Sequence, residues 1–151
     1  MPMPHAYRHA SRDWRGILDD AKEGMGLVSD NSAYTAIQGV LLVFRRRLSV
    51  QQGLRFATML PAVPRAIFVA DWDVSEPVLP FGPLDEMTRE AQALRPHHNL
   101  TPDNAIEATA WALRRAVLPA DFERALAACP PEAAEFWRVD ADPSELGPRF
   151  V

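Results

Sequence analysis

Three carboxylates around a tryptophan are the first residues in this 151-residue chain whose spacing could do chemistry. Asp71, Asp73 and Glu76 lie close together in sequence, next to Trp72. Oxygen ligands in a short loop suit a hard cation such as calcium or magnesium. The alternative is that Asp71 and Asp73 cap a helix end and a turn, as aspartate commonly does. Because the cluster is not a complete set of ligands, the sequence predicts no metal site.

Histidine and cysteine give no complete site either. His5 and His9 stand at i and i+4, which places two side chains on one helical face, but prolines nearby indicate a frayed chain end. The adjacent side chains of His97 and His98 diverge, so a solvated loop is the alternative to a metal contact. Cys129 falls on the inward side of its predicted helix, where a thiol acts as a small apolar group. Without a known catalytic or phosphate-binding motif, the sequence predicts no catalytic residue and no cofactor.

Arginine accounts for nearly all of the basic residues. Arg45, Arg46 and Arg47 are expected to end one long helix, where cations complement the helix dipole. Together with Arg65 they are also the candidate anion contacts, because a guanidinium can bind an anion through two hydrogen bonds. The formal net charge of −4 argues against nucleic acid, which is held mainly by clustered cations.

Composition is typical of one folded domain, with 48% hydrophobic and 24% charged residues. A single cysteine cannot form an internal disulfide, which favours a reducing compartment. The longest strongly apolar run, Val40 to Phe44, is too short to span a bilayer, and the first residues do not resemble a signal peptide. We therefore expect a cytoplasmic protein with no membrane association.

The spacing of apolar residues predicts an all-α fold of seven to eight helices, because apolar stripes recur with the helical period and no segment alternates as a strand would. Prolines mark most helix boundaries. The first helix is expected to have Ser11 as its N-cap and to carry Asp19 and Asp20 on its solvated face. The second helix, from about Asp30 or Ser32, has the broadest apolar surface, so we expect Phe44 at the centre of the first half.

Two segments of the chain repeat the same order of features. At an offset of 69 residues, Arg45-Arg46 align with Arg114-Arg115, and Pro61 aligns with Pro130. Such internal similarity indicates two structural copies packed as one compact, bundle-like domain. The expected organisation is a flexible N-terminus (1–10), one helical domain (11–139) made of two similar halves (11–72 and 83–137) joined by a Pro-rich loop (73–82), and a C-terminal tail (140–151).

The Pro-rich loop carries apolar side chains that cannot join a helical stripe, because proline prevents a helix there. Val78, Leu79 and Phe81 must therefore be covered by something else, together with the nearby Trp72. The cover is either the junction of the two halves or another molecule. These four residues are the candidate interaction surface.

Several short motifs occur in the order that one known family has. They are Ala33-Tyr34-Thr35-Ala36-Ile37, Arg45-Arg46-Arg47-Leu48, Leu60-Pro61, Arg65, Phe68, Asp71-Trp72 and Pro77. With them the chain resembles the bacterial family named domain of unknown function 2267, from about Trp14 to Trp137. Asp71 stands where glycine is usual in that family. The resemblance implies a repeated helical fold, and it brings no established activity, ligand or catalytic residue.

Two functions agree with these features. The favoured one is a non-enzymatic module for protein interaction or self-association, with an unknown protein or a second copy of the chain as partner. The alternative is a helical domain that binds a small anionic ligand in an apolar pocket between the halves, with arginines at the mouth of the pocket. A stable dimer in solution would favour the first function, and a monomer carrying a co-purified ligand would favour the second.

Overall fold

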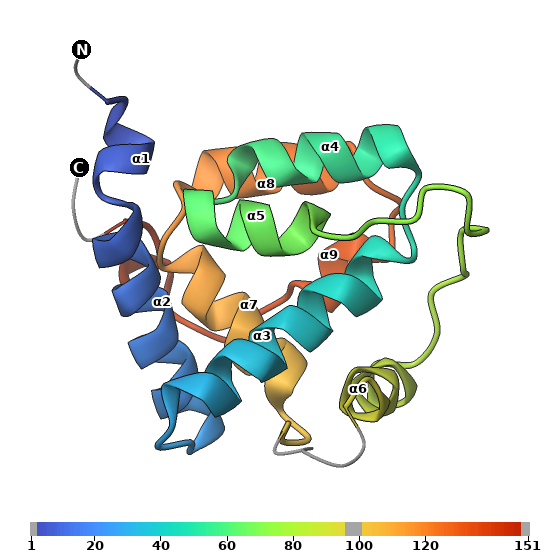
Figure 1. The fold of residues 1–151 in the computed structure, drawn as a ribbon, viewed down its shortest axis with the longest axis horizontal. Helices are drawn as coiled ribbons and strands as arrows, with labels where there is room; N and C mark the ends of the chain where they lie inside the picture. The colour runs from blue at the N-terminus through green and yellow to red at the C-terminus, as the bar shows by residue number, and fades with distance from the viewer. Residues whose placement is uncertain (1–2, 96–100, 149–151) are drawn as a thin grey trace.

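The chain is helical in the computed structural model, which describes residues 3–95 and 101–148 and has no β-strand in those ranges (Figure 1). The described residues form nine α-helices and a 3₁₀ helix, so the expected count of seven to eight is wrong by the short helix α1. The elements are α1 (His5–Arg8), α2 (Ala10–Met25), α3 (Asp30–Arg45), α4 (Val50–Met59), α5 (Ala62–Val69), α6 (Leu84–Ala93), α7 (Ala105–Arg114), α8 (Pro119–Ala127), α9 (Ala133–Phe136) and the 3₁₀ helix (Pro143–Glu145).

Helix α1 forms where the sequence indicated fraying. The carbonyl of Pro4 accepts hydrogen bonds from the N–H groups of Tyr7 and Arg8, both at 3.0 Å. Proline is compatible with this position because an N–H before the first turn would have no helical partner. Helix α2 then begins ahead of Ser11, so the predicted N-cap is also wrong; His9 takes that position without a side-chain cap.

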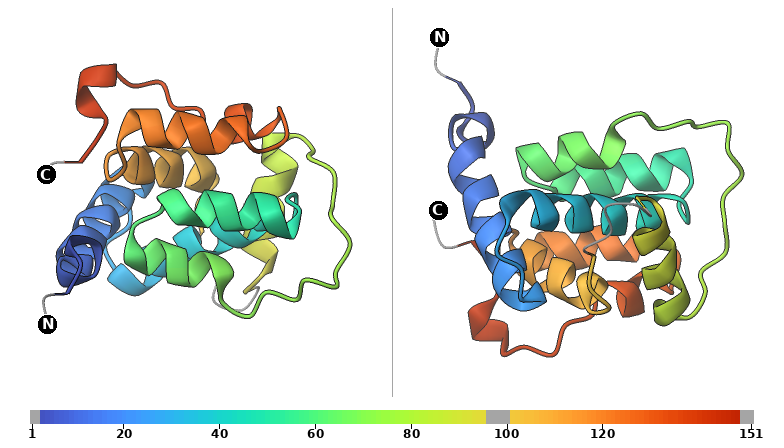
Figure 2. Two further views of the ribbon diagram at one scale, coloured as in Figure 1. Left: turned by 90° about the horizontal axis from the view of Figure 1, so that it is seen from above. Right: turned by 60° about the horizontal axis from the view of Figure 1, so that its bottom comes forward.

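The helices pack around α3 and α7, which cross in the middle of the molecule (Figure 1). Helix α2 packs most extensively on α7, while α3 also contacts α2, α5 and α6. Helix α4 lies between α5 and α8 and contacts both; the view from above separates α4 from α8 (Figure 2). A long loop leads from α5 to α6 around one side of the molecule.

A cluster of buried aromatic rings joins the two halves. The ring of Phe44 in α3 lies 4.8 Å from that of Phe56, 5.0 Å from that of Phe136 and 5.2 Å from that of Trp137. All four side chains are fully buried, and Phe122 of α8 packs on Trp137. The expected central position of Phe44 is confirmed, and its neighbours come from both halves of the chain.

One arginine in each half binds a backbone carbonyl near the end of that half. Arg45 Nη1 donates to the carbonyl of Phe68 at 2.9 Å, and Arg114 Nε donates to the carbonyl of Trp137 at 2.7 Å. Each contact joins residues that are 23 positions apart. In both halves, therefore, the end of a long helix is tied to the end of a shorter helix by the same kind of bond.

A segment without α-helix follows each of these ties and returns to a long helix. After α5, the N–H of Leu79 donates to the carbonyl of Arg46 at 2.9 Å. After α9, the N–H of Gly147 donates to the carbonyl of Arg114, also at 2.9 Å. Each of the two segments is thus held to the end of a long helix by a backbone hydrogen bond.

Trp72 fills the space that a side chain at position 53 would occupy. A Cβ atom on Gly53 would lie 2.2 Å from the indole ring, far below van der Waals contact. The guanidinium carbon of Arg45 lies 5.3 Å from the centre of the same ring. Glycine at position 53 therefore lets the indole rest directly on the backbone of α4.

We expect Gly53→Ala to lower the free energy of unfolding by about 1–2 kcal/mol, because displacement of the indole outweighs the better helix propensity of alanine. The same change at Gly16 of α2 is the control, since a Cβ there meets no atom within 4 Å. Gly16→Ala should raise the free energy of unfolding by about 0.5–1 kcal/mol. Urea unfolding measures both changes, and equal stabilisation by both would show that Trp72 is not held against Gly53.

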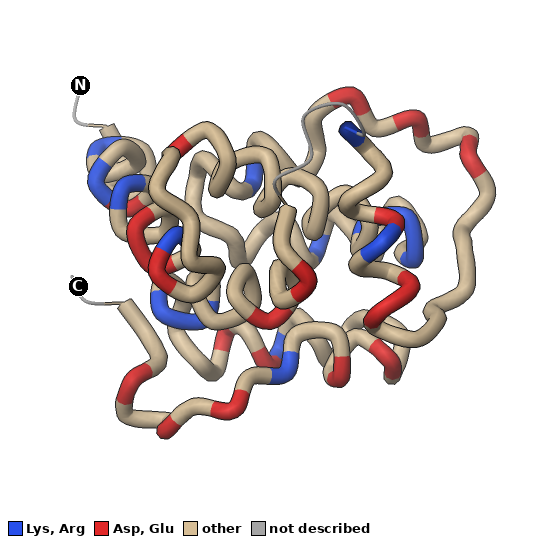
Figure 3. The backbone as a smooth tube through the Cα atoms, turned by 90° about the horizontal axis from the view of Figure 1, so that it is seen from below, with Lys and Arg blue, Asp and Glu red and all other residues tan. Residues whose placement is uncertain are grey.

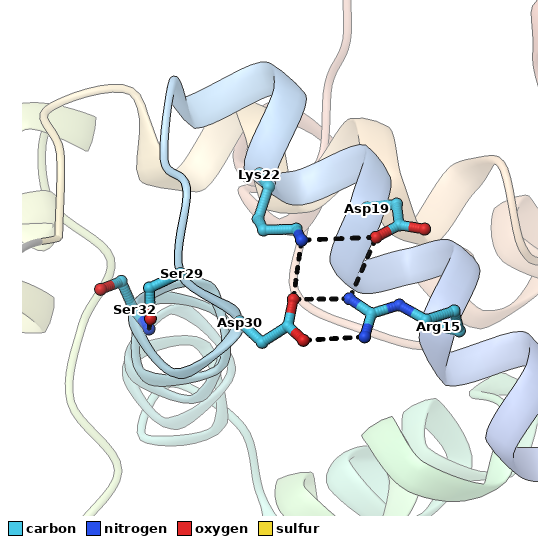
Figure 4. A network of polar contacts seen from close by, with 6 residues as sticks. All are labelled: Arg15, Asp19, Lys22, Ser29, Asp30 and Ser32. Carbon is cyan, nitrogen blue, oxygen red and sulfur yellow. Dashed lines mark hydrogen bonds and ion pairs between the residues drawn. The ribbon is translucent and has the colours of Figure 1, made fainter.

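An ion-pair network joins α2 to the first turn of α3 (Figure 4). Arg15 binds both carboxylate oxygens of Asp30, at 2.6 and 2.8 Å, and Lys22 Nζ lies 2.7 Å from the same carboxylate. Asp19 contacts both cations as well. The hydrogen bonds from Arg15 and Lys22 hold the pKa of Asp30 well below its ordinary value.

This network predicts a dependence of stability on pH. A depressed pKa means that Asp30 stabilises the fold fully above its ordinary pKa of 3.8 and progressively less as the pH falls below it. The difference in melting temperature between the protein and Asp30→Asn should be constant from about pH 7 to about pH 5 and shrink below about pH 4. It should also shrink in about 1 M salt, which screens exposed charges. Equal melting temperatures at neutral pH would contradict the prediction.

Charged residues of both signs are spread over the backbone, with acidic positions along the loop that follows α5 and along the C-terminal segment (Figure 3). Within residues 3–95 and 101–148, no helix combines the length and the apolar character needed to cross a membrane.

Candidate functional site

The four candidate anion contacts lie at two places in the fold. Arg45 binds the carbonyls of Phe68 and Ala70 at the end of α5, and Arg46 pairs with Glu90 of α6 at 3.2 Å. Arg47 is buried, and it binds the same Glu90. N–H groups of Arg45, Arg46 and Arg47 that would bind an anion are therefore already engaged by groups of the protein.

Arg65 lies apart from the other three, beside the end of α4. Its Nε donates to the carbonyl of Ala57 at 3.0 Å, and its Nη2 donates to the carbonyls of Thr58 and Leu60 at 3.2 and 3.0 Å. Its Nη1 donates to the hydroxyl of Tyr7 in α1 at 3.3 Å. All four acceptors are neutral, and no carboxylate forms an ion pair with Arg65 in the part of the chain that the structure describes.

The candidate interaction surface is divided by the fold. Trp72 and Phe81 are partly buried, and the ring of Phe81 lies 6.1 Å from that of Phe44. Val78 and Leu79, by contrast, remain 56% and 37% exposed. The chain's own core thus covers the two aromatic residues, while the two aliphatic residues face solvent.

A cavity of about 470 Å³ lies between the two halves, and we call it the inter-half cavity. Side chains from α1, α2, the end of α4, the α4–α5 turn, α5, the α7–α8 turn and α8 line it, together with Pro148 of the C-terminal segment. The lining is mostly apolar and includes Ile17, Met59, Leu60 and Val117. Its residues are His5, Ala6, Arg12, Asp13, Gly16, Ile17, Asp20, Met59, Leu60, Pro61, Arg65, Arg115, Ala116, Val117, Leu118, Asp121 and Pro148.

Three arginines line the inter-half cavity, and two of them are paired with aspartates that also line it. Arg12 lies 3.5 Å from Asp13, and Arg115 lies 3.2 Å from the buried carboxylate of Asp20. Arg65 is the third, and its acceptors are the neutral groups described above. The charge of Arg65 is therefore the one that an anionic ligand in this cavity would meet.

Other hollows fit an anionic ligand less well. The hollow beneath the loop after α5, lined in part by Arg45, Arg46 and Trp72, has a volume of only about 210 Å³. A groove of about 510 Å³ between α6, α7 and α9 has five carboxylates and one arginine along its sides, so it repels anions. These differences favour the inter-half cavity as the candidate site.

Three other predicted features do not assemble a site. Asp73 accepts hydrogen bonds from the N–H and hydroxyl of Ser75, which forms the turn expected for it and lowers its pKa. No group of three or more potential metal ligands comes together within the described ranges. Burial raises the pKa of Cys129 to about 11. His97 and His98 lie outside the described residues.

Asp71 has a left-handed backbone conformation, with φ of 53°. It follows the C-cap of α5, a position where glycine is common because it adopts this conformation without strain. We expect Asp71→Gly to raise the free energy of unfolding by up to about 1 kcal/mol. Asp73→Gly is the control and should lower it, because the turn with Ser75 is lost. A lower unfolding midpoint for Asp71→Gly in urea would show that the carboxylate outweighs the strain.

Sequence reasoning placed Asp20 on the solvated face of its helix, and this is wrong. Asp20 is buried and binds Arg115, which comes from the other half of the chain. One signal was present: Asp20 lies beside Ala21 and three residues after Ile17, at the edge of the apolar stripe of α2. An acidic residue at such an edge needs a buried partner, but the sequence does not identify which arginine supplies it.

A family described as an uncharacterized conserved protein, domain of unknown function 2267, matches residues 14–136. No curated protein matches the sequence.

Proposed function

Because the chain belongs to the family of domain of unknown function 2267, which is uncharacterized, we propose a function from the geometry of the inter-half cavity. The protein is a non-enzymatic module that binds a small amphipathic molecule. The ligand has an apolar body, held by the walls of the cavity, and one anionic group, which faces Arg65. This proposal adopts the pocket between the halves that was the alternative prediction from sequence.

The observation that carries the proposal is the environment of Arg65. A guanidinium at the edge of an apolar cavity retains its charge, and here its acceptors are three carbonyls and one hydroxyl. The other two arginines of the cavity already have carboxylate partners. A few convergent polar groups in a mostly apolar cavity are typical of small-molecule sites.

Binding rather than catalysis is supported by the residues present. The raised pKa of Cys129, about 11, means that its thiol is protonated at neutral pH and is a poor nucleophile. Cys129 also remains a free thiol, which supports the cytoplasm as the proposed compartment.

Gly16 offers a way to fill the cavity without damage to the fold. It lines the inter-half cavity, and a Cβ built on it meets no atom within 4 Å. Gly16→Leu should therefore place its side chain in the cavity, while the helix gains propensity. Gly16→Ala is the matched control, because it gains similar propensity with only one added methyl group.

Calorimetric titration with octanoate tests the proposal. We expect binding to the protein and to Gly16→Ala, and at least about tenfold weaker binding to Gly16→Leu, a loss of about 1.4 kcal/mol. Both variants should unfold at urea concentrations similar to or higher than that of the parent. If the parent protein fails to bind octanoate, or if Gly16→Leu binds it as tightly as Gly16→Ala does, the proposal is wrong.

Self-association through the loop after α5 is a second candidate, and the exposure of Val78 and Leu79 favours it. Apolar side chains that stay exposed in one loop become buried when that loop binds another surface, which favours association. Leu79→Glu should convert a dimer to a monomer if this surface binds a second copy, while the backbone bond from Leu79 to Arg46 preserves the loop. Light scattering measures the mass, and a parent protein that is already monomeric would remove this candidate.

We also propose that the two halves are copies of one helical unit. The ties from Arg45 to Phe68 and from Arg114 to Trp137 support this, since the paired residues differ by 69 positions at both ends. The returning segments support it too, because each ends in a hydrogen bond to a carbonyl at the end of a long helix. On this view the inter-half cavity is a junction between two copies.

A further inference from the structure

We infer that the N-terminal helix α1 forms part of the ligand site, and that Tyr7 and Arg65 together bind the carboxylate of an amphipathic monoacid. The inference rests on the proposed function and names the class of ligand and the residues that bind its charged end. Helix α1 is close enough to take part, since His5 and Ala6 line the inter-half cavity. Tyr7 is not itself part of the lining, but its hydroxyl contacts the lining residue Arg65.

The hydrogen bonds of Arg65 leave one donor for a ligand. A guanidinium has five N–H groups, one on Nε and two on each Nη. Three of them bind the carbonyls at the end of α4, and a fourth, on Nη1, binds the hydroxyl of Tyr7. The second N–H of Nη1 has no acceptor among the described residues, and it lies on the side of the guanidinium that meets Tyr7.

Tyr7 supplies a second donor next to the first. Its oxygen accepts the hydrogen bond from Arg65, so its own hydroxyl hydrogen is free to donate. The side chain is 50% exposed, and the distance of 3.3 Å to Arg65 Nη1 is long for a hydrogen bond. A carboxylate beside the pair can accept one bond from Tyr7 and one from Arg65.

This pair of donors favours a monoacid over a phosphate. One N–H and one O–H match the two oxygens of a carboxylate, whereas a phosphate presents three oxygens and a larger charge. The remaining charges of the cavity are balanced, because Arg12 and Arg115 have carboxylate partners and the third lining carboxylate, Asp121, pairs with Arg124 at 2.9 Å. A single negative charge therefore neutralises Arg65 without leaving an excess.

Binding at this position should also fix α1 in place. Helix α1 has no buried residue, and it is held to α5 by the bond between Tyr7 and Arg65. A ligand that bridges these two side chains adds a link between α1 and the rest of the fold. Trypsin cleavage after Arg8, which lies at the exposed end of α1, should then slow when the site is filled.

The decisive comparison uses octanoate and octanol with the parent protein, Tyr7→Phe and Tyr34→Phe. Tyr7→Phe removes only the hydroxyl, and we expect it to weaken octanoate binding about tenfold, as loss of a hydrogen bond to a charged group does. Octanol has no carboxylate, so its affinity should be the same for all three proteins. Tyr34→Phe is the matched control, since Tyr34 packs on Trp14 and its hydroxyl accepts a hydrogen bond from Gln38 rather than from Arg65.

Each outcome decides between the two proposals. If Tyr7→Phe binds octanoate as tightly as the parent does, while Gly16→Leu blocks binding, the cavity is the ligand site but α1 takes no part, and this inference fails alone. Equal protection of the Arg8 site by octanoate and octanol would overturn it too. If the parent protein binds neither probe, both proposals are wrong.

Discussion

Truncation of Phe44 to alanine is expected to lower the free energy of unfolding by about 3–5 kcal/mol, the largest effect of any single change considered. The ring lies at the centre of the aromatic cluster, in contact with Phe56 of the first half and with Phe136 and Trp137 of the second. Removing it leaves a cavity that rigid neighbouring rings cannot easily fill.

Urea unfolding followed by circular dichroism measures this change. Val78→Ala is the control, because Val78 is exposed and its truncation should alter the free energy of unfolding by no more than about 0.5 kcal/mol. A loss below about 1 kcal/mol for Phe44→Ala would mean that the ring is not central to the packing of the two halves.

Replacement of Arg47 by methionine should cost about 2–3 kcal/mol, although the two side chains are similar in length. Arg47 is 9% exposed and binds Glu90 of α6, which is itself only 25% exposed. The same guanidinium donates to the carbonyl of Val43 at 3.0 Å and to that of Pro80 in the loop at 3.3 Å. Without Arg47, the partly buried carboxylate of Glu90 keeps only Arg46 as its cationic partner among the described residues. The loop also loses the hydrogen bond that Arg47 donates to Pro80.

Arg89→Met provides the comparison on α6, the helix that carries Glu90. Arg89 pairs with Asp85 at 3.6 Å, but both side chains are largely exposed, so the change should cost no more than about 0.5 kcal/mol. In a double-mutant cycle, Arg47→Met should cost much less once Glu90 is glutamine. Similar losses for Arg47→Met and Arg89→Met would show that burial of the Arg47 pair contributes little.

The fold was largely predictable because its helices are amphipathic and bounded by proline. The broad apolar surface of α3 indicated a central helix, and Phe44 lies where that surface predicts. The prediction failed at α1, where prolines that start a short helix were interpreted as signs of fraying. Proline excludes a helix interior but is compatible with a helix start, and composition alone does not separate the two cases.

The candidate site was much less predictable. The inter-half cavity is formed by segments near positions 5–20, 59–65 and 115–121, and helical periodicity does not specify which of these meet. Arg65 was identified as a possible anion contact from its type alone. Whether Arg65 can bind an anion depends on how many of its N–H groups already donate to the carbonyls at the end of α4. Those contacts depend on the angle between α4 and α5, which the sequence does not give.

The indole that rests on Gly53 has a counterpart in the second half. The guanidinium of Arg45 covers the ring of Trp72, and that of Arg114 covers the ring of Phe122 at 4.4 Å. Phe122 stands 69 positions after Gly53, so α8 in the second half corresponds to α4 in the first. In the second half the ring beneath the arginine belongs to α8 itself, whereas in the first half it belongs to Trp72, which follows α5. If the halves are copies, as proposed, Gly53 and Trp72 in the first half together replace the single residue Phe122 of the second. In a chimera with α8 in the position of α4, the ring of Phe122 would occupy the space that the ring of Trp72 fills in the first half. The helices of the two halves could therefore be exchanged only together with the rest of each half.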